Sequence, residues 1–260
     1  MFKEYFLNNN ETILTELKNS EYKNTAKALL SFYEKSLSID NVITSIDYEK
    51  DFYPCLILVR SQIEHFIVSS YIWIQFRLNE NDKTASIYYG EYLIQEIIKR
   101  LNYAKQNNIS LTSKYSIAFQ KILETLTDKQ IIKQKHIQEI NFDANQFDIK
   151  RINKFYEKNL PLKFDNIIKS DRIKEFLEFY NYFSSFVHGG PSADAFIQEH
   201  EKERKKIIEN TSYIQEWSSN LVGFQRLFIF YFIIMKNEKF ENDFKDEFEK
   251  FMKKTVANKR

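Results

Sequence analysis

Glycine, proline and cysteine are scarce in this sequence, and each shortage excludes a class of protein. Four glycines and three prolines among 260 residues leave few positions for the turns of a β-rich fold. The single cysteine, Cys55, excludes an internal disulfide framework and cannot make a zinc site alone, which is typical of proteins in a reducing compartment. The composition therefore predicts a helical protein of the cytoplasm.

A strong charge of one sign is also missing. The chain has 38 basic and 36 acidic residues, a formal charge of +2, so no overall field marks it as a binder of nucleic acid or membranes. The longest apolar run, Leu221–Met235, is shorter than the roughly 20 residues that cross a bilayer and contains Gln225 and Arg226. We expect a core helix there and no membrane span. The opening stretch MFKEYFLNNNETI lacks the apolar region of a signal peptide, which also favours the cytoplasm.

What the sequence does contain is apolar residues at helical spacing. They make up 43% of the chain, enough for a large core, and they predict an all-α, multi-helix bundle in a single domain over 1–260. Any subdivision would fall near 159–169, where Pro161 disfavours helix in the residue before it, and NFDANQFD at 141–148 is expected to be irregular. Helices are expected over Glu11–Leu37 with a break near Ser20, Asp51–Leu78, Lys83–Gln106, Lys114–Gln138, Ile149–Lys158, from Ser170 to the glycines at 189 and 190, Ser192–Met235 and Asn237–Lys254.

Charged residues interrupt the most apolar part of the second of these helices, LILVRSQIEHFIVSSYIWIQF at 56–76. Arg60 and Glu64 lie one turn apart on the flank of one apolar stripe, and His65 lies on the opposite face. A buried charge costs several kcal/mol unless it is paired, so we expect Arg60 to pair with Glu64. The first stripe consists of Leu56, Val59, Ile63, Phe66, Ile67, Ser70 and Ile74, and the second of Leu58, Ile72 and Phe76.

A second polar pair, Ser184 and His188, lies one turn apart in FYNYFSSFVHGGP. A histidine at a helix C-terminus gains up to about 1 kcal/mol from the helix dipole, which accounts for His188 but not for a hydroxyl one turn earlier. That hydroxyl lies near the apolar stripe of Ile173, Phe176, Leu177, Tyr180, Phe183 and Val187. His136 and His200 stand among charges and are expected to be solvated. No H-E-x-x-H motif occurs and no glutamate stands three residues before a histidine, so we expect no metal and no cofactor.

The two clusters together carry a resemblance to a known group of proteins. RSQIEH, from Arg60 to His65, matches the R-x-x-x-x-H spacing of HEPN domains, all-helical families found in bacterial toxins, phage-defence proteins and CRISPR-associated ribonucleases. LVRSQIEH together with YFSSFVHGG also resembles an uncharacterised, HEPN-like bacterial family whose signature helices read R-S-x-x-E and S-x-x-x-H. The resemblance covers residues 50–80 and 170–200 and implies a HEPN-like core with additional helices.

The resemblance implies metal-independent cleavage of RNA, in which a ribose 2′-hydroxyl attacks the adjacent phosphate. Arg60 would stabilise the phosphate, His65 or His188 would move the proton, Glu64 would orient Arg60, and Ser184 would supply a hydrogen bond. Helix geometry sets Arg60 and His65 about 140° apart, which weakens direct cooperation between them within one chain. The resemblance implies a site that is composite across a homodimer.

Two other hypotheses remain open from the residues. In one, the chain is a non-catalytic helical module that senses a ligand or a protein partner, such as a neighbouring gene product, and Arg60, Glu64, Ser184 and His188 form a buried polar network. In the other, the basic cluster EKERKK at 201–206 or the basic tail binds nucleic acid or a membrane surface.

Overall fold

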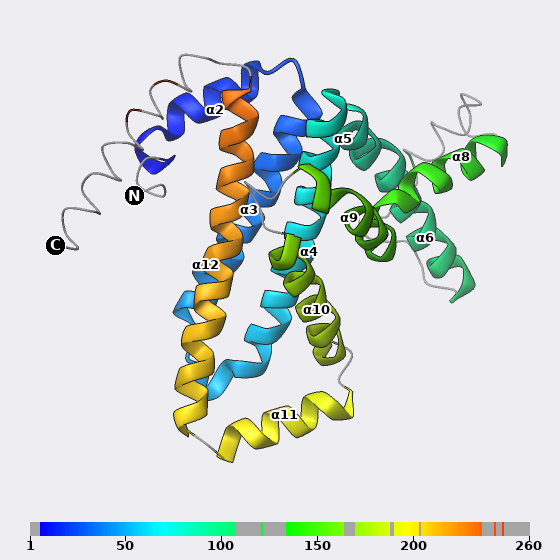
Figure 1. The fold of residues 1–260 in the computed structure, drawn as a ribbon. Helices are drawn as coiled ribbons and strands as arrows, with labels where there is room; N and C mark the ends of the chain where they lie inside the picture. Colours follow the sequence, from blue (N-terminus) through cyan, green and yellow to red (C-terminus); the bar gives the residue numbers. More distant parts are fainter. Residues whose placement is uncertain are drawn as a thin grey trace.

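The computed structural model describes residues 6–107, 121, 134–163, 170–187, 190–202, 204–235, 242 and 246. These residues contain no strand, and the predicted all-α multi-helix bundle is confirmed (Figure 1). The elements are α2 (Asn10–Asn19), α3 (Lys23–Ser45), α4 (Tyr48–Asn79), α5 (Lys83–Ile87), the π-helix η1 (Tyr88–Tyr92), α6 (Leu93–Gln106), α8 (Gln134–Ala144), the 3-10 helix η2 (Asn145–Phe147), α9 (Ile149–Lys163), α10 (Ser170–Val187), α11 (Pro191–Lys202) and α12 (Arg204–Ile234).

Helix α4 lies at the centre of the bundle, with α3, α10 and α12 packed around it (Figure 1). Both apolar faces predicted for it are covered, and Leu58 alone among those residues is only partly buried. Aromatic rings join the layers: Trp73 stacks on Phe228 of α12 at 5.0 Å, and Phe66 meets Phe176 of α10 at 4.8 Å between ring centroids. A helix covered on two sides shows no single apolar stripe, as expected for the core of a large bundle.

The break expected near Ser20 is present, between α2 and α3. The Ser20 hydroxyl accepts a hydrogen bond from the backbone N–H of Tyr22 at 3.1 Å, but α3 begins three residues after Ser20 and takes its cap from elsewhere. The carboxylate of Asp82, which precedes α5, accepts bonds from the N–H groups of Asn24 and Thr25 at 2.9 and 2.6 Å and from the Thr25 hydroxyl at 2.6 Å. An acid from a distant turn therefore neutralises the positive end of α3.

Two expected interruptions are wrong. Helix α8 continues to Ala144, through the first half of the stretch expected to be irregular, and α9 continues through Pro161 to Lys163. A proline this close to the end of a helix removes one backbone hydrogen bond and leaves little helix after it to disturb. Burial favours α9 strongly, because the Tyr156 hydroxyl donates to the carbonyl of Ile67 at 2.8 Å and is fully buried against α4.

The helix expected over Lys83–Gln106 is present but contains one wide turn, the π-helix η1. At this turn Tyr88 and Tyr92 stack at 5.5 Å and both contact Phe147 of η2, at 5.2 and 5.4 Å, and Tyr88 also contacts Phe32 of α3 at 5.4 Å. Single π-turns are often found at functional sites.

In the C-terminal half the expected helix starts are confirmed, but the single helix expected over Ser192–Met235 is divided into α11 and α12. Helix α10 begins at Ser170, and α11 begins at Pro191, where a proline costs no hydrogen bond. The apolar run Leu221–Met235 belongs to α12 in the core, and no described helix is both long and apolar enough to cross a membrane. Most of the helix expected over Lys114–Gln138, residues 164–169 of the expected linker and most of Asn237–Lys254 lie outside the described residues.

The cap from Asp82 gives a test of this packing. We expect Asp82→Ala to lower the free energy of unfolding by about 2 kcal/mol, because three donors at the start of α3 lose their acceptor. Urea unfolding followed by circular dichroism measures the change. Glu157→Ala removes an exposed carboxylate from α9 and serves as the control, expected within about 0.5 kcal/mol of the parent. Equal effects of the two substitutions would contradict the role of Asp82.

Candidate functional site

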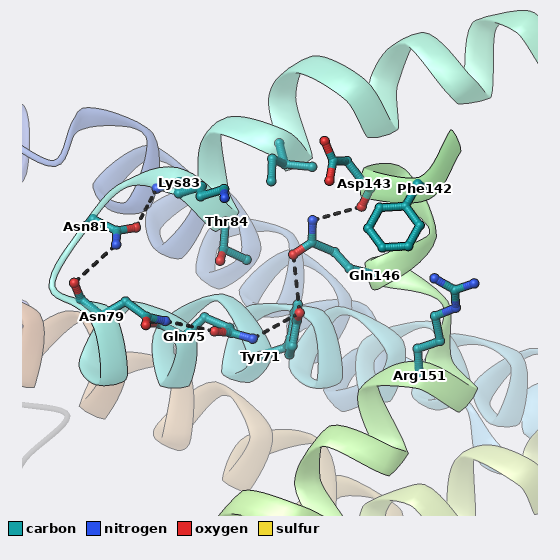
Figure 2. A pocket seen from close by; sticks show the side chains of 11 residues that line it. Tyr71, Gln75, Asn79, Asn81, Lys83, Thr84, Phe142, Asp143, Gln146 and Arg151 are labelled. Carbon is teal, nitrogen blue, oxygen red and sulfur yellow. Dashed lines mark hydrogen bonds between the residues drawn. The ribbon is translucent and has the colours of Figure 1, made fainter. Parts of the chain in front are cut away.

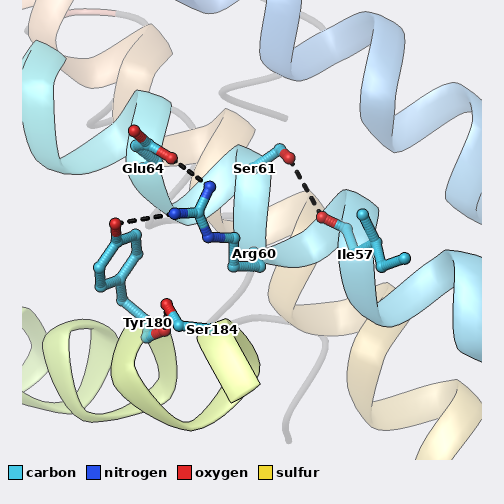
Figure 3. A network of polar contacts seen from close by, with 6 residues as sticks. All are labelled: Ile57, Arg60, Ser61, Glu64, Tyr180 and Ser184. Carbon is cyan, nitrogen blue, oxygen red and sulfur yellow. Dashed lines mark hydrogen bonds and ion pairs between the residues drawn. The ribbon is translucent and has the colours of Figure 1, made fainter. Parts of the chain in front are cut away.

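Arg60 reaches from the middle of α4 to the facing surface of α10 (Figure 3). One guanidinium nitrogen forms the predicted ion pair with Glu64, one turn along the same helix, and the other donates to the hydroxyl of Tyr180 at 2.9 Å. The guanidinium carbon also lies 4.8 Å from the centre of the Tyr180 ring. Among the described residues its Nε is buried and has no hydrogen-bond partner. Arg60 is therefore a cross-link between two core helices.

This cross-link is not sealed from water. The Arg60 side chain is 21% exposed and the Glu64 side chain 38% exposed. Solvent screens an ion pair with this exposure, so its contribution to stability depends mainly on the hydrogen bonds that fix its geometry. We call Arg60, Glu64 and Tyr180 the arginine centre.

Tyrosines surround the carboxylate of the arginine centre. Burial raises the pKa of Tyr180, and the charge of Glu64 raises it further against the opposing effect of Arg60. Burial followed by the charges of Glu96 and Glu64 raises the pKa of Tyr92 to about 12, and the pKa of Tyr88 is also raised, first by burial. These phenols stay protonated at neutral pH, so they act as hydrogen-bonding groups rather than as proton acceptors.

Ser184 lies next to the arginine centre on α10 (Figure 3). Its hydroxyl donates to the backbone carbonyl of Tyr180 at 2.7 Å, which is a bond within its own helix. Among the described residues it makes no hydrogen bond to Arg60. His188 lies outside the described residues, directly after Val187, the last residue of α10.

His65 faces away from the arginine centre. Its ring lies 5.9 Å from the ring of Phe32 on α3, on a different side of α4 from Tyr180. Burial and then the nearby charge of Lys35 lower the pKa of His65 to about 4, and its buried Nδ1 has no hydrogen-bond partner among the described residues. The structure thus brings Arg60, Glu64 and Ser184 to one place and puts His65 elsewhere within the chain.

The chemistry available at the arginine centre follows from these positions. The positive charge of Arg60 is already matched by Glu64, and the charge of Glu96 reaches the same tyrosines. A polyanion would gain little there unless Glu64 moved aside. No described group of three or more histidine, cysteine or acidic residues could hold a metal ion. The side chains of His136, His200 and the EKERKK cluster lie outside what the structure describes.

Sequence reasoning missed Tyr180, which it placed in the apolar stripe of α10. That stripe is buried at Ile173, Phe176, Leu177 and Phe183, whereas Tyr180 is half-buried and Val187 is exposed. The missed signal is spacing, because Tyr180 stands one turn before Ser184 on the side that faces α4. The tyrosines of η1 carried no comparable signal, since their direction depends on the π-turn.

Comparison with known proteins gives a family but no characterised relative. Residues 26–206 match a family model described as a family of unknown function, DUF5677, and the match includes α4 and α10 in full. No curated protein and no solved structure matches the chain.

The environment of His65 predicts a pH dependence of stability. Because its folded pKa of about 4 is below the ordinary value of 6.5, the unfolded chain binds the proton more readily, and His65 destabilises the fold as the pH falls from about 6.5 to 4. We expect the stability of the parent relative to a His65→Gln variant to decline across this window. Urea unfolding of both proteins at pH values of about 7, 5.5 and 4.5 measures the difference and cancels the titration of the groups that they share. A constant difference would contradict the buried position of His65.

Proposed function

The chain belongs to the DUF5677 family of unknown function, and from its site we propose that it is a non-catalytic helical module that senses a ligand or a protein partner. One observation carries the proposal: both terminal nitrogens of the Arg60 guanidinium donate hydrogen bonds within the fold, one to Glu64 and the other to Tyr180. A guanidinium held in this way fixes α10 against α4 and has little charge left for a substrate.

The position of His65 supports the same proposal. A general acid or base works best with a pKa near the working pH, and the pKa of about 4 leaves His65 a weak base and almost never protonated at neutral pH. His65 contacts Phe32 of α3, whereas Arg60 contacts Tyr180 of α10, so the two side chains lie on different sides of α4. Arg60 and His65 therefore lack the arrangement that a single-chain acid–base site needs.

A HEPN-like ribonuclease is the second candidate, favoured by the exposure of the arginine centre. With 21% of Arg60 and 38% of Glu64 open to water, a second copy of the chain could bring its own histidine to this surface. His188, four residues after Ser184, is the other histidine that the resemblance assigns to proton transfer. In this hypothesis the chain acts on RNA in the bacterial cytoplasm as a dimer, in a toxin or phage-defence system.

Cleavage of RNA separates the two candidates. We expect the purified chain to leave a mixed-sequence RNA intact in EDTA at neutral pH, because the charge of Arg60 is engaged and His65 is neutral and turned away. Gel analysis of the RNA after incubation measures this. The same assay is run with Arg60→Ala, His65→Ala and His188→Ala.

An exposed arginine of α6 provides the matched control in this assay. Arg100→Ala removes an arginine far along the chain from the arginine centre and controls for the loss of an exposed arginine as such. Cleavage that survives in Arg60→Ala and in both histidine variants marks a contaminating nuclease. Cleavage by the parent and by Arg100→Ala that is lost in Arg60→Ala and in one of the histidine variants would overturn the module and establish the ribonuclease.

A further inference from the structure

A polar cleft of about 510 Å³ opens between α4, α5, α8 and α9, three turns along α4 from the arginine centre (Figure 2). Its volume is in the range of sites for small molecules, which is roughly 300–1,000 Å³. Most such sites are lined by apolar side chains, whereas amides, charges and hydroxyls dominate here. A ligand that fits this cleft must therefore form many hydrogen bonds with the protein.

One wall of the cleft is a relay of amides fixed before any ligand arrives. Asn79 donates to the side chain of Gln75 at 3.0 Å, Gln75 donates to the hydroxyl of Tyr71 at 3.1 Å, and that hydroxyl donates to Gln146 at 3.2 Å. Gln146 also donates to the backbone carbonyl of Asp143 at 2.8 Å. Figure 2 shows this relay running from α4 to Gln146 of η2. Side chains held in this way lose little entropy when a ligand binds.

Other groups at the cleft have no partner within the described part of the chain. The side chains of Lys83 and Arg151 make no hydrogen bond or ion pair there, and the carboxylate of Asp143 makes none. Two cations against one acid give the cleft an excess of positive charge, unlike the arginine centre. Phe142 is 73% exposed and lies on the same side of the cleft as Arg151 (Figure 2).

We propose that this cleft binds a small organic phosphate, an inference that rests on the chain being a binding module. Arg151 supplies the planar fork that matches phosphate oxygens, and Lys83 adds a second positive charge. The amides of Gln75 and Gln146 suit a body rich in hydroxyls or ring nitrogens, because each amide both donates and accepts. The exposed ring of Phe142 offers a flat surface to a heterocycle or a sugar face.

Titration calorimetry on the full chain tests the proposal with three probes. Adenosine monophosphate and glucose 6-phosphate share the phosphate and differ in the body, and inorganic phosphate lacks a body. We expect saturable one-to-one binding of at least one organic phosphate, at least tenfold tighter than inorganic phosphate. Binding of the nucleotide alone or of the sugar phosphate alone identifies the body that the amides accept.

Two variants tie the binding to this cleft. Arg151→Ala and Phe142→Ala are each expected to weaken the organic phosphate at least tenfold, whereas Arg100→Ala leaves the affinity unchanged. Arg151 and Phe142 are exposed, so melting curves that match the parent show that the variants fold. Absence of binding at millimolar concentrations, equal binding of inorganic phosphate, or unchanged affinity in both cleft variants would overturn the proposal.

Failure here is distinct from failure of the proposed function. If the organic phosphates do not bind and the RNA stays intact, the phosphate proposal fails while the proposed binding module stands with a different ligand. RNA cleavage that depends on Arg60 overturns the module whatever the cleft binds.

Discussion

The buried polar side chains of α4 depend on neighbouring helices for hydrogen-bond partners, because α4 lies at the centre of the bundle. Gln62 shows how far this constraint is met: it is fully buried, and its amide nitrogen donates to the carbonyls of Ser36 on α3 and Ser218 on α12 at 3.1 and 3.2 Å. Its amide oxygen has no partner among the described residues. Ser70 shares a bond of 2.6 Å with Tyr156 of α9. An unpartnered group at these positions would cost about 1–3 kcal/mol. These bonds, as much as the apolar contacts, decide which helices pack against α4.

Arg60 meets the same constraint at the edge of the core. Its bonds to Glu64 and Tyr180 satisfy a charge that would otherwise be poorly solvated and attach α10 to α4. The same face of α4 continues to Tyr71 and Gln75, each eleven residues after a member of the arginine centre and therefore about 16 Å further along the helix. Phe147 contacts both Tyr71 and the tyrosines of η1, so packed aromatic rings connect the cleft with the surroundings of Glu64.

The sequence was sufficient to predict the all-α class, the bounds of α4 to within three residues and the pairing of Arg60 with Glu64, because apolar periodicity and one-turn spacing are local properties. It misled at Pro161, where burial of α9 on α4 outweighs a local preference, and it treated Tyr180 as an apolar residue. The π-turn at Tyr88–Tyr92 and the cleft could not be predicted. Both depend on which helices meet, and the residues of the cleft come from stretches of ordinary polar composition.

A double-mutant cycle between Arg60 and Tyr180 tests most directly whether the arginine centre joins α10 to α4. The free energy of unfolding is measured by urea for the parent, Arg60→Ala, Tyr180→Phe and the double variant. The 2.9 Å bond between these side chains predicts a coupling energy of about 1 kcal/mol. A coupling energy of about zero would contradict the account, because the two side chains would then stabilise the fold independently.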